Sequence, residues 1–217
     1  MVRNLPIEYW APEREWEGQD AFLIGGGPSL KGFDFTQLQG LHTIGCNDAI
    51  HLGPEIVEVL LFGDRMWWER NKHLIKDFPN RVVTDCPFLL RYNFPRILKM
   101  SRERDGLHSG STLGWNFSTG ASAINLALSF GAKRIFLLGY DLSSKGKESH
   151  WHSYNTKVIR EDSFQGFIRG FERVKKNLPE DVRIFNVTDG SSRLECFVKA
   201  SFEDLRCILQ ERMAFHR

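Results

Sequence analysis

The stretch Phe22-Leu-Ile-Gly-Gly-Gly-Pro-Ser-Leu30 runs an apolar segment directly into a glycine-rich turn. A short apolar run that ends in glycines is typical of a buried parallel strand. The glycines allow a close backbone approach that a Cβ would prevent, and the free N–H groups of such a turn suit phosphate oxygens. We therefore predict a contact with phosphate or ribose by five residues, namely Gly25, Gly26, Gly27, Pro28 and Ser29. The alternative is a plain tight turn.

The turn matches neither standard nucleotide-binding fingerprint. A dinucleotide motif would need glycine in place of Leu30, and a P-loop would need Lys-Ser/Thr after its second glycine. The prediction of a phosphate contact therefore depends on the position of the turn directly after the first predicted strand.

Strand and helix signals alternate along the chain. Strands are predicted at residues 21–24, 43–44, 57–62, 81–84, 134–138 and 182–187, and helices at 66–78, 118–130, about 164–174 and 201–213. Residues 87–112 carry turn signals and positive charges and are left unassigned. This alternation predicts a single Rossmann-like α/β domain at 20–217, with an open, mainly parallel sheet and helices on both faces. Residues 1–19 are expected to be an extension whose tryptophans, Trp10 and Trp16, pack onto the domain.

Bulk composition restricts the function classes. The chain has 217 residues and a net charge of +2, which gives no general reason to expect nucleic acid or an anionic membrane as partner, although a local basic patch stays open. That patch would come from Arg91, Arg96, Lys99, Arg102 and Arg104, as a solvated face or as a site for an acidic or phosphorylated partner. The four cysteines form no CxxC pair, so a zinc site is not expected. There is no membrane-spanning run and no signal-peptide core, so we expect a cytoplasmic protein.

Polar residues follow the second and third predicted strands. Ligands of parallel sheets gather beyond the carboxyl ends of the strands. Asn47 and Asp48, both predicted nucleotide contacts, follow one strand, where the Asn47 amide suits a base edge or a ribose, and Asp64 follows the next. Asp64 is predicted either to bind a ribose, a magnesium ion or a substrate amine, or to cap the helix that follows it.

The segment Ser118-Thr119-Gly120 begins the small-residue helix. The N–H groups and the dipole at a helix N-terminus favour negative charge, so these three residues are a candidate anion site. Simple helix capping is the alternative.

Tyr140, a predicted nucleotide contact, and Asp141 end the strongest predicted strand, and His150 and His152 follow in a polar loop. Loop histidines at a strand edge are candidate acid–base groups because their ordinary pKa lies close to neutrality. Metal binding and a structural role are the alternatives. Asp141 would orient a histidine, bind magnesium or cap a turn. The aromatic residues of the loop, Trp151 and Tyr154, would supply a stacking face.

In their order and spacing these segments resemble the MptE-like family, whose named members are archaeal 6-hydroxymethylpterin pyrophosphokinases, and especially its small phage-encoded members. The matching pieces are Gly25–Leu30, Asn47-Asp48, Ser118–Gly120, Leu138–Asp141 with His150–His152, and 184–197. For a phage protein, the expected location would be the host cytoplasm.

The chain is also similar to motility accessory factors and to bacterial sialyltransferases that use CMP-sugars. In the sialyltransferases an Asn-Gly-Pro-Ser-Leu turn, an Arg-Cys-Asn segment, a Ser-Gly helix start and a His-Ser-x-Asn-Thr loop form the CMP site and supply the base. The corresponding stretches are Gly27–Leu30, Gly45–Asn47, Thr119-Gly120 and His152–Thr156. Glycine replaces the turn asparagine, and the helical lid expected after the sheet is short or absent.

The resemblances imply three functions. The first is a nucleotide-sugar transferase in which Asn47 reads the donor nucleoside and His152 deprotonates an unknown acceptor, with no metal required. The second is a pyrophosphokinase in which Asp64 and Asp141 hold Mg²⁺ and diphosphate passes from ATP to a hydroxymethyl group. The third is a nucleotide-binding protein without turnover. An oligomer is compatible with each.

Overall fold

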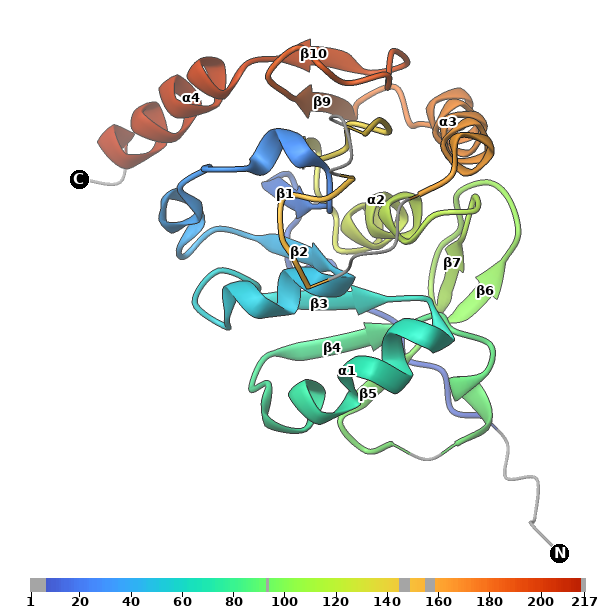
Figure 1. Ribbon diagram of the computed structural model, residues 1–217. Coiled ribbons are helices and arrows are strands. Elements are labelled where there is room, and N and C mark those ends of the chain that lie inside the picture. The colour runs from blue at the N-terminus through green and yellow to red at the C-terminus, as the bar shows by residue number, and fades with distance from the viewer. Residues whose placement is uncertain (1–6, 93, 145–148, 155–158, 216–217) are drawn as a thin grey trace, which may run out of the picture.

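A computed structural model describes residues 7–92, 94–144, 149–154 and 159–215, the last four by their backbone alone. The core is one eight-stranded sheet in the order β10-β9-β8-β1-β2-β3-β4-β5 (Figure 1). Its strands are β1 (Asp20–Ile24), β2 (Thr43–Cys46), β3 (Val59–Phe62), β4 (Arg81–Thr84), β5 (Ile97–Lys99), β8 (Arg134–Leu138), β9 (Arg183–Val187) and β10 (Val198–Ala200). All of the strand pairs described are parallel. The predicted Rossmann-like α/β fold is confirmed.

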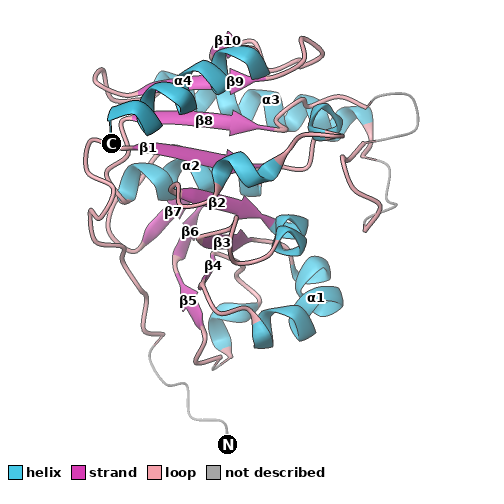
Figure 2. Ribbon diagram, turned by 90° about the vertical axis from the view of Figure 1, so that its left-hand side faces the viewer, coloured by secondary structure: helices cyan, strands magenta, loops and turns pink. Residues whose placement is uncertain are grey.

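Helices cover both faces of this sheet (Figure 2). Helices α2 (Thr119–Ser129) and α3 (Glu161–Lys176) contribute to one apolar cluster. Helices α1 (Arg65–Asp77) and α4 (Phe202–Phe215) contribute to the other. The inner strands β1, β2, β3 and β8 are buried on both faces, which explains their continuous apolar sequences.

Four short strands are not predicted by the sequence analysis. Strands β5 and β6 (Ser101–Glu103) lie in the unassigned stretch 87–112, and β7 (Thr112–Gly114) begins at its last residue. Strand β6 pairs with β7 in a small parallel sheet of its own. Strand β10 has two exposed residues, which removes the apolar signal. Three residues with mixed burial give too little periodicity to predict a strand.

The segment before β1 is anchored by aromatic packing. Trp16 is fully buried, and its ring stacks on Phe130 at a centroid distance of 4.2 Å. The Trp16 backbone N–H donates to the Phe130 carbonyl over 2.8 Å, and Trp10 packs on the same ring. These contacts attach residues 10–16 to the end of α2.

Strand β1 lies where the strand order reverses. The chain proceeds from β1 through β2, β3, β4 and β5 in one direction, and β8, β9 and β10 fill the other side. In such sheets the crevice beyond the carboxyl ends at the reversal is the usual ligand site. The glycine turn follows β1 and the Tyr140-Asp141 segment follows β8, so both lie at this position.

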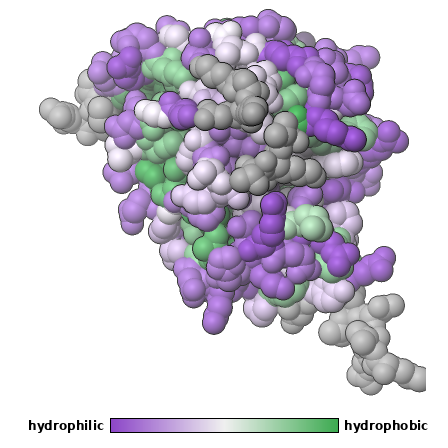
Figure 3. Space-filling view, viewed as in Figure 1, coloured by the Kyte–Doolittle hydropathy of each residue, from purple (hydrophilic) through white to green (hydrophobic). Residues whose placement is uncertain are grey.

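The outer surface carries only scattered apolar side chains. Among the described residues, the large exposed ones come from five separate parts of the chain and are Ile7, Tyr9, Met66, Tyr92, Tyr154 and Val198. The face in Figure 3 accordingly shows small hydrophobic patches interrupted by polar side chains. Within the described ranges, no helix is both long enough and apolar enough to cross a membrane.

Candidate active site

The histidine segment is hydrogen-bonded directly to the glycine turn. The Trp151 backbone N–H donates to the Gly26 carbonyl over 3.0 Å. The Trp151 indole N–H donates to the Gly25 carbonyl, also over 3.0 Å. Two stretches more than 120 residues apart therefore meet at the carboxyl edge of β1 (Figure 1). Trp151, expected as a stacking face, thus fastens the loop to the turn.

Asp141 closes the other side of the glycine turn. Its fully buried carboxylate accepts from the Ser29 backbone N–H over 2.7 Å and from the Ser29 hydroxyl over 2.6 Å. A Cβ on Gly27 would lie 2.5 Å from an oxygen of this carboxylate and 2.6 Å from the Gly139 carbonyl oxygen. Glycine at 27 is thus needed for the turn to approach Asp141. Of the roles predicted for Asp141, the structure supports turn capping.

Tyr140 is buried, and its role as a nucleotide contact stays a prediction. Its ring lies against Gly25 and Gly120, where added Cβ atoms would approach ring carbons to 3.1 and 2.8 Å. The hydroxyl donates to the Gly120 carbonyl over 3.4 Å, and Cys46 Sγ lies 3.8 Å away. Burial raises the pKa of Tyr140 well above its ordinary value and that of Cys46 to about 12. These glycines make room for a side chain of the protein itself.

His152 lies against Asp48, at the end of β2. Its Nε2 is 3.7 Å from Asp48 Oδ2, and the two side chains are only 3 % and 8 % exposed. The Trp67 indole N–H donates to Asp48 Oδ1 over 2.7 Å and holds the carboxylate in place. Among the residues described, His152 Nδ1 is buried and has no hydrogen-bond partner. The carboxylate that the structure brings to the histidine is therefore Asp48, whereas Asp141 had been considered for this role.

Burial sets the charge state of His152. Its pKa is lowered to about 4, mainly by desolvation and with smaller contributions from the imidazoles of His150 and His51, while the Asp48 charge opposes the shift. The ring is therefore neutral at pH 7. A neutral imidazole with an unused ring nitrogen is able to accept a proton.

His150 and His51 flank this group. The His150 Nδ1 is 3.0 Å from the Ser149 hydroxyl, and a Cβ on Gly26 would lie 3.1 Å from its ring. His51 lies in the 3₁₀ helix Asn47–Leu52 and stacks on Tyr154 at 3.7 Å between centroids. Burial lowers the pKa of both imidazoles. Sequence reasoning missed His51, although it lies four residues after Asn47 in the same short helix.

Asn47 has an unusual backbone for a side-chain-bearing residue. Its φ is +52°, in the left-handed region, and its buried Oδ1 has no hydrogen-bond partner within the described part of the chain. Buried amide oxygens are normally paired. Strain combined with an unsatisfied acceptor is typical of a position kept for a ligand.

The Asp64 and Ser118 side chains cap helices. Asp64 Oδ1 accepts from the Trp67 backbone N–H over 2.7 Å at the start of α1. Ser118 Oγ accepts from the Gly120 backbone N–H over 3.1 Å at the start of α2. Both positions thus match the capping alternatives stated above. Thr119 lies beside them, with its hydroxyl 3.3 Å from where a Gly63 Cβ would be.

A further buried ion pair, not anticipated from the sequence, lies beside Thr119. Arg102 donates to Asp85 Oδ1 over 2.8 Å and to the Gly63 carbonyl over 2.7 Å, and Asp85 Oδ2 accepts from Ser122. Asp85 directly follows β4, as Asp48 closely follows β2. A carboxylate directly after a parallel strand is the sequence signal that indicates this position.

The predicted magnesium ligands do not come together. Asp64 follows β3 and Asp141 follows β8, and three strand spacings, roughly 14 Å, separate these strand ends. Their oxygens are used by Trp67 and Ser29. The described residues include no group of three or more His, Cys, Asp or Glu side chains arranged to hold a metal ion. Asn155 and Thr156, part of the predicted histidine motif, lie outside the described residues.

Comparison with known proteins gives a likeness in structure only. No protein-family model matches the chain, and no curated protein matches it in sequence. The sialyltransferase CstII from Campylobacter jejuni, solved with the substrate analogue cytidine-5'-monophosphate, superposes with a TM-score of 0.52 at 16% identity, over 84% of this chain and 85% of that chain. A second CstII structure, with CMP-3FNeuAc, gives 0.46 at 17% identity over 83% and 84%. The resemblance to the MptE-like family stays a prediction, whereas the chain shares the fold of the sialyltransferase CstII.

Proposed function

We propose that this protein is a glycosyltransferase that uses a CMP-sugar or a similar nucleotide-sugar donor. The observation that carries the proposal is the meeting of the glycine turn with the His150–His152 segment, where His152 lies buried beside Asp48. The fold shared with a sialyltransferase that was solved with cytidine-5'-monophosphate supports the choice of donor.

Donor binding is assigned to the edge formed by the glycine turn, Asn47 and the first turn of α2. The backbone N–H groups of Gly26 and Thr119 would face the phosphate. Those of Gly25, Gly27 and Gly120 already donate to the Leu138 carbonyl, the Gly139 carbonyl and the Ser118 hydroxyl. The unpartnered Asn47 Oδ1 would accept a hydrogen bond from an amino group of the nucleoside base. A pyrimidine amine offers such a donor.

In the transfer step, the acceptor oxygen forms a bond to the anomeric carbon of the donor sugar. The bond from that carbon to the phosphate oxygen breaks, and the nucleoside monophosphate leaves with the electron pair. The hydroxyl proton passes to His152 Nδ1, while Asp48 stabilises the imidazolium through Nε2. Because Nδ1 is buried, an acceptor reaches it only after the 149–154 segment shifts.

The test measures CMP binding by calorimetry, with and without Mg²⁺, and release of CMP from CMP-sialic acid with a panel of glycan acceptors. Metal-independent CMP binding and acceptor-dependent release are expected. His152→Ala should abolish transfer and keep CMP binding, and His73→Ala, at an exposed position on α1, is the matched control.

The remaining outcomes are informative. Transfer by His152→Ala at the wild-type rate would show that the base assignment is wrong. Magnesium-dependent ATP binding without CMP binding would favour the pyrophosphokinase. Nucleotide binding without product from any acceptor would favour the non-catalytic alternative.

A further inference from the structure

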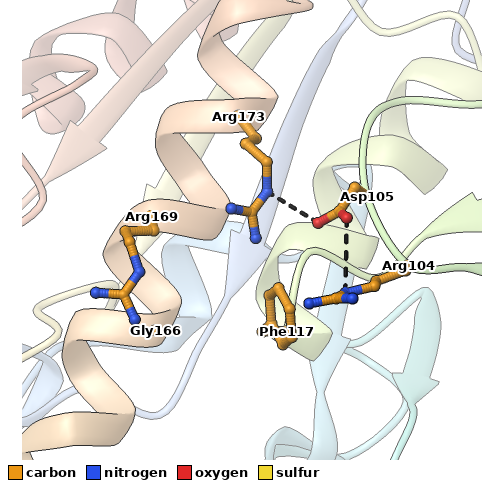
Figure 4. A pocket seen from close by; sticks show the side chains of 6 residues that line it. All are labelled: Arg104, Asp105, Phe117, Gly166, Arg169 and Arg173. Carbon is orange, nitrogen blue, oxygen red and sulfur yellow. Dashed lines mark ion pairs between the residues drawn. The ribbon is translucent and has the colours of Figure 1, made fainter.

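A cavity lies between α3 and the turn that follows β6, away from the histidines. Its volume is about 270 Å³. It is lined by Arg104, Asp105, Phe117, Gly166, Arg169 and Arg173 (Figure 4). The basic stretch noted in the sequence contributes Arg104, and α3 contributes the other two arginines.

The cavity carries more positive than negative charge. Among the described residues that line it, only Asp105 is acidic, and it pairs with Arg173 over 2.9 Å and with Arg104 over 3.7 Å. Arg169 has no ion pair or hydrogen bond to another side chain within the described part of the chain. Three guanidinium groups around one carboxylate leave a surplus of two positive charges, which an anionic ligand would neutralise.

The aromatic floor of the cavity is held rigidly. The guanidinium carbons of Arg104 and Arg173 each lie 5.1 Å from the centre of the Phe117 ring (Figure 4). Asn116 and Phe117 both have left-handed φ values, +46° and +66°. Buried Asn116 holds this backbone by donating to the Gly106 carbonyl and accepting from the Gly106 N–H. Both guanidinium groups therefore already lie over one ring, so less freedom is lost when they bind a ligand.

Gly166 and Gly170 both lie on α3 but differ in the space around them, and this difference indicates a ligand beside Gly166. A Cβ on Gly170 would lie 2.0 Å from the Asn116 carbonyl oxygen, so packing requires glycine there. A Cβ on Gly166 would meet nothing within 4 Å, although glycine in a helix interior lowers stability by about 1 kcal/mol relative to alanine. Packing within the protein therefore does not explain Gly166, whereas a ligand that fills the cavity beside it would.

We propose that this cavity binds a small ligand through its phosphate or carboxylate groups, with Arg169 and Arg173 as the binding residues and Phe117 as the floor. Guanidinium groups bind both kinds of oxyanion with paired hydrogen bonds. The volume suits a small metabolite or a single end group of a larger molecule. The site is independent of the proposed transferase chemistry.

The test titrates the full chain with inorganic pyrophosphate and, separately, with citrate, using calorimetry at constant ionic strength. Saturable one-to-one binding is expected for at least one probe, and the preferred probe separates phosphate from carboxylate ligands. Arg169→Ala should weaken binding about three- to tenfold. Gly166→Leu should abolish it by filling the cavity. CMP binding should stay unchanged in both variants, so the outcome does not depend on the proposed function.

Arg206→Ala on α4 is the matched control, since it removes one exposed positive charge elsewhere. Thermal unfolding of each variant checks that the fold is kept. The proposal is wrong if neither probe saturates, or if Arg169→Ala and Gly166→Leu weaken binding no more than Arg206→Ala does.

Discussion

Asp48 Oδ2 lies 3.7 Å from His152 Nε2, and the indole of Trp67 fixes the same carboxylate through its other oxygen. Asp141, at the end of β8, is instead occupied with Ser29. The two carboxylates thus have separate roles. Asp48 lies beside the candidate base, whereas Asp141 holds the glycine turn that would bind the donor.

The first prediction concerns the charge on Asp48. Asp48→Asn should lower the transfer rate about 10- to 100-fold, because the imidazolium formed during proton transfer loses its stabilising charge. Donor affinity should change less than about threefold, since Asp48 is not assigned to donor binding. Steady-state kinetics and calorimetry measure the two quantities. Asp77→Asn, at the far end of α1, is the control. Equal losses of rate and of donor affinity would contradict the assignment.

The second prediction concerns Gly27. Gly27→Ala should lower the free energy of unfolding by about 2–3 kcal/mol, because the new methyl group overlaps Asp141 and the Gly139 carbonyl. Urea unfolding followed by circular dichroism measures the change. Gly166→Ala is the matched comparison, where open space predicts a gain of up to about 1 kcal/mol. A Gly27→Ala protein of wild-type stability would mean that the turn does not approach Asp141 as described.

The third prediction concerns the pH dependence of stability. His152 has a pKa of about 4 in the folded chain and about 6.5 when unfolded, so between these values the unfolded state binds more protons. Stability should therefore fall as the pH drops from 6.5 towards 4, by roughly 2–3 kcal/mol from this residue. Urea unfolding at several pH values tests this. His152→Gln should flatten the profile and His73→Gln should not; equal slopes in all three proteins would refute the burial of His152.

The fourth prediction separates binding from folding at Asn47. Glycine adopts left-handed φ values easily, so Asn47→Gly should keep the free energy of unfolding within about 1 kcal/mol. The same change removes the unpartnered Oδ1 and should weaken CMP binding about tenfold. Calorimetry and chemical unfolding measure the two effects. Unchanged CMP affinity would show that Asn47 does not contact the nucleoside.

The fold was largely predictable because its inner strands are buried on both sides. Segments such as residues 134–138 are apolar without interruption, and Ser118 and Gly131 stand at the ends of α2 as the capping rules predict. The short outer strands were missed because three residues of mixed burial show no period. The helix-capping roles of Asp64 and Ser118 were among the stated alternatives.

The partners within the candidate site were harder to predict. Whether Asp48 or Asp141 meets His152 depends on how the 149–154 segment folds back over the sheet, and local sequence does not encode that path. Gly25 and Gly120 were read as space for a ligand, whereas the Tyr140 ring occupies it. A glycine pattern indicates a close approach but does not identify the approaching group.

The central place of β1 also constrains how the molecule is made. Its partner β8 lies more than 100 residues further along the chain, and Arg134 pairs with Asp20 across that junction. Until residues 134–138 leave the ribosome, one edge of β1 has no strand to pair with. Pairing is then slowed further because the loop between β1 and β8 is long and its closure costs entropy. During synthesis this exposed edge is the point at which a chaperone, or a neighbouring unfinished chain, would attach.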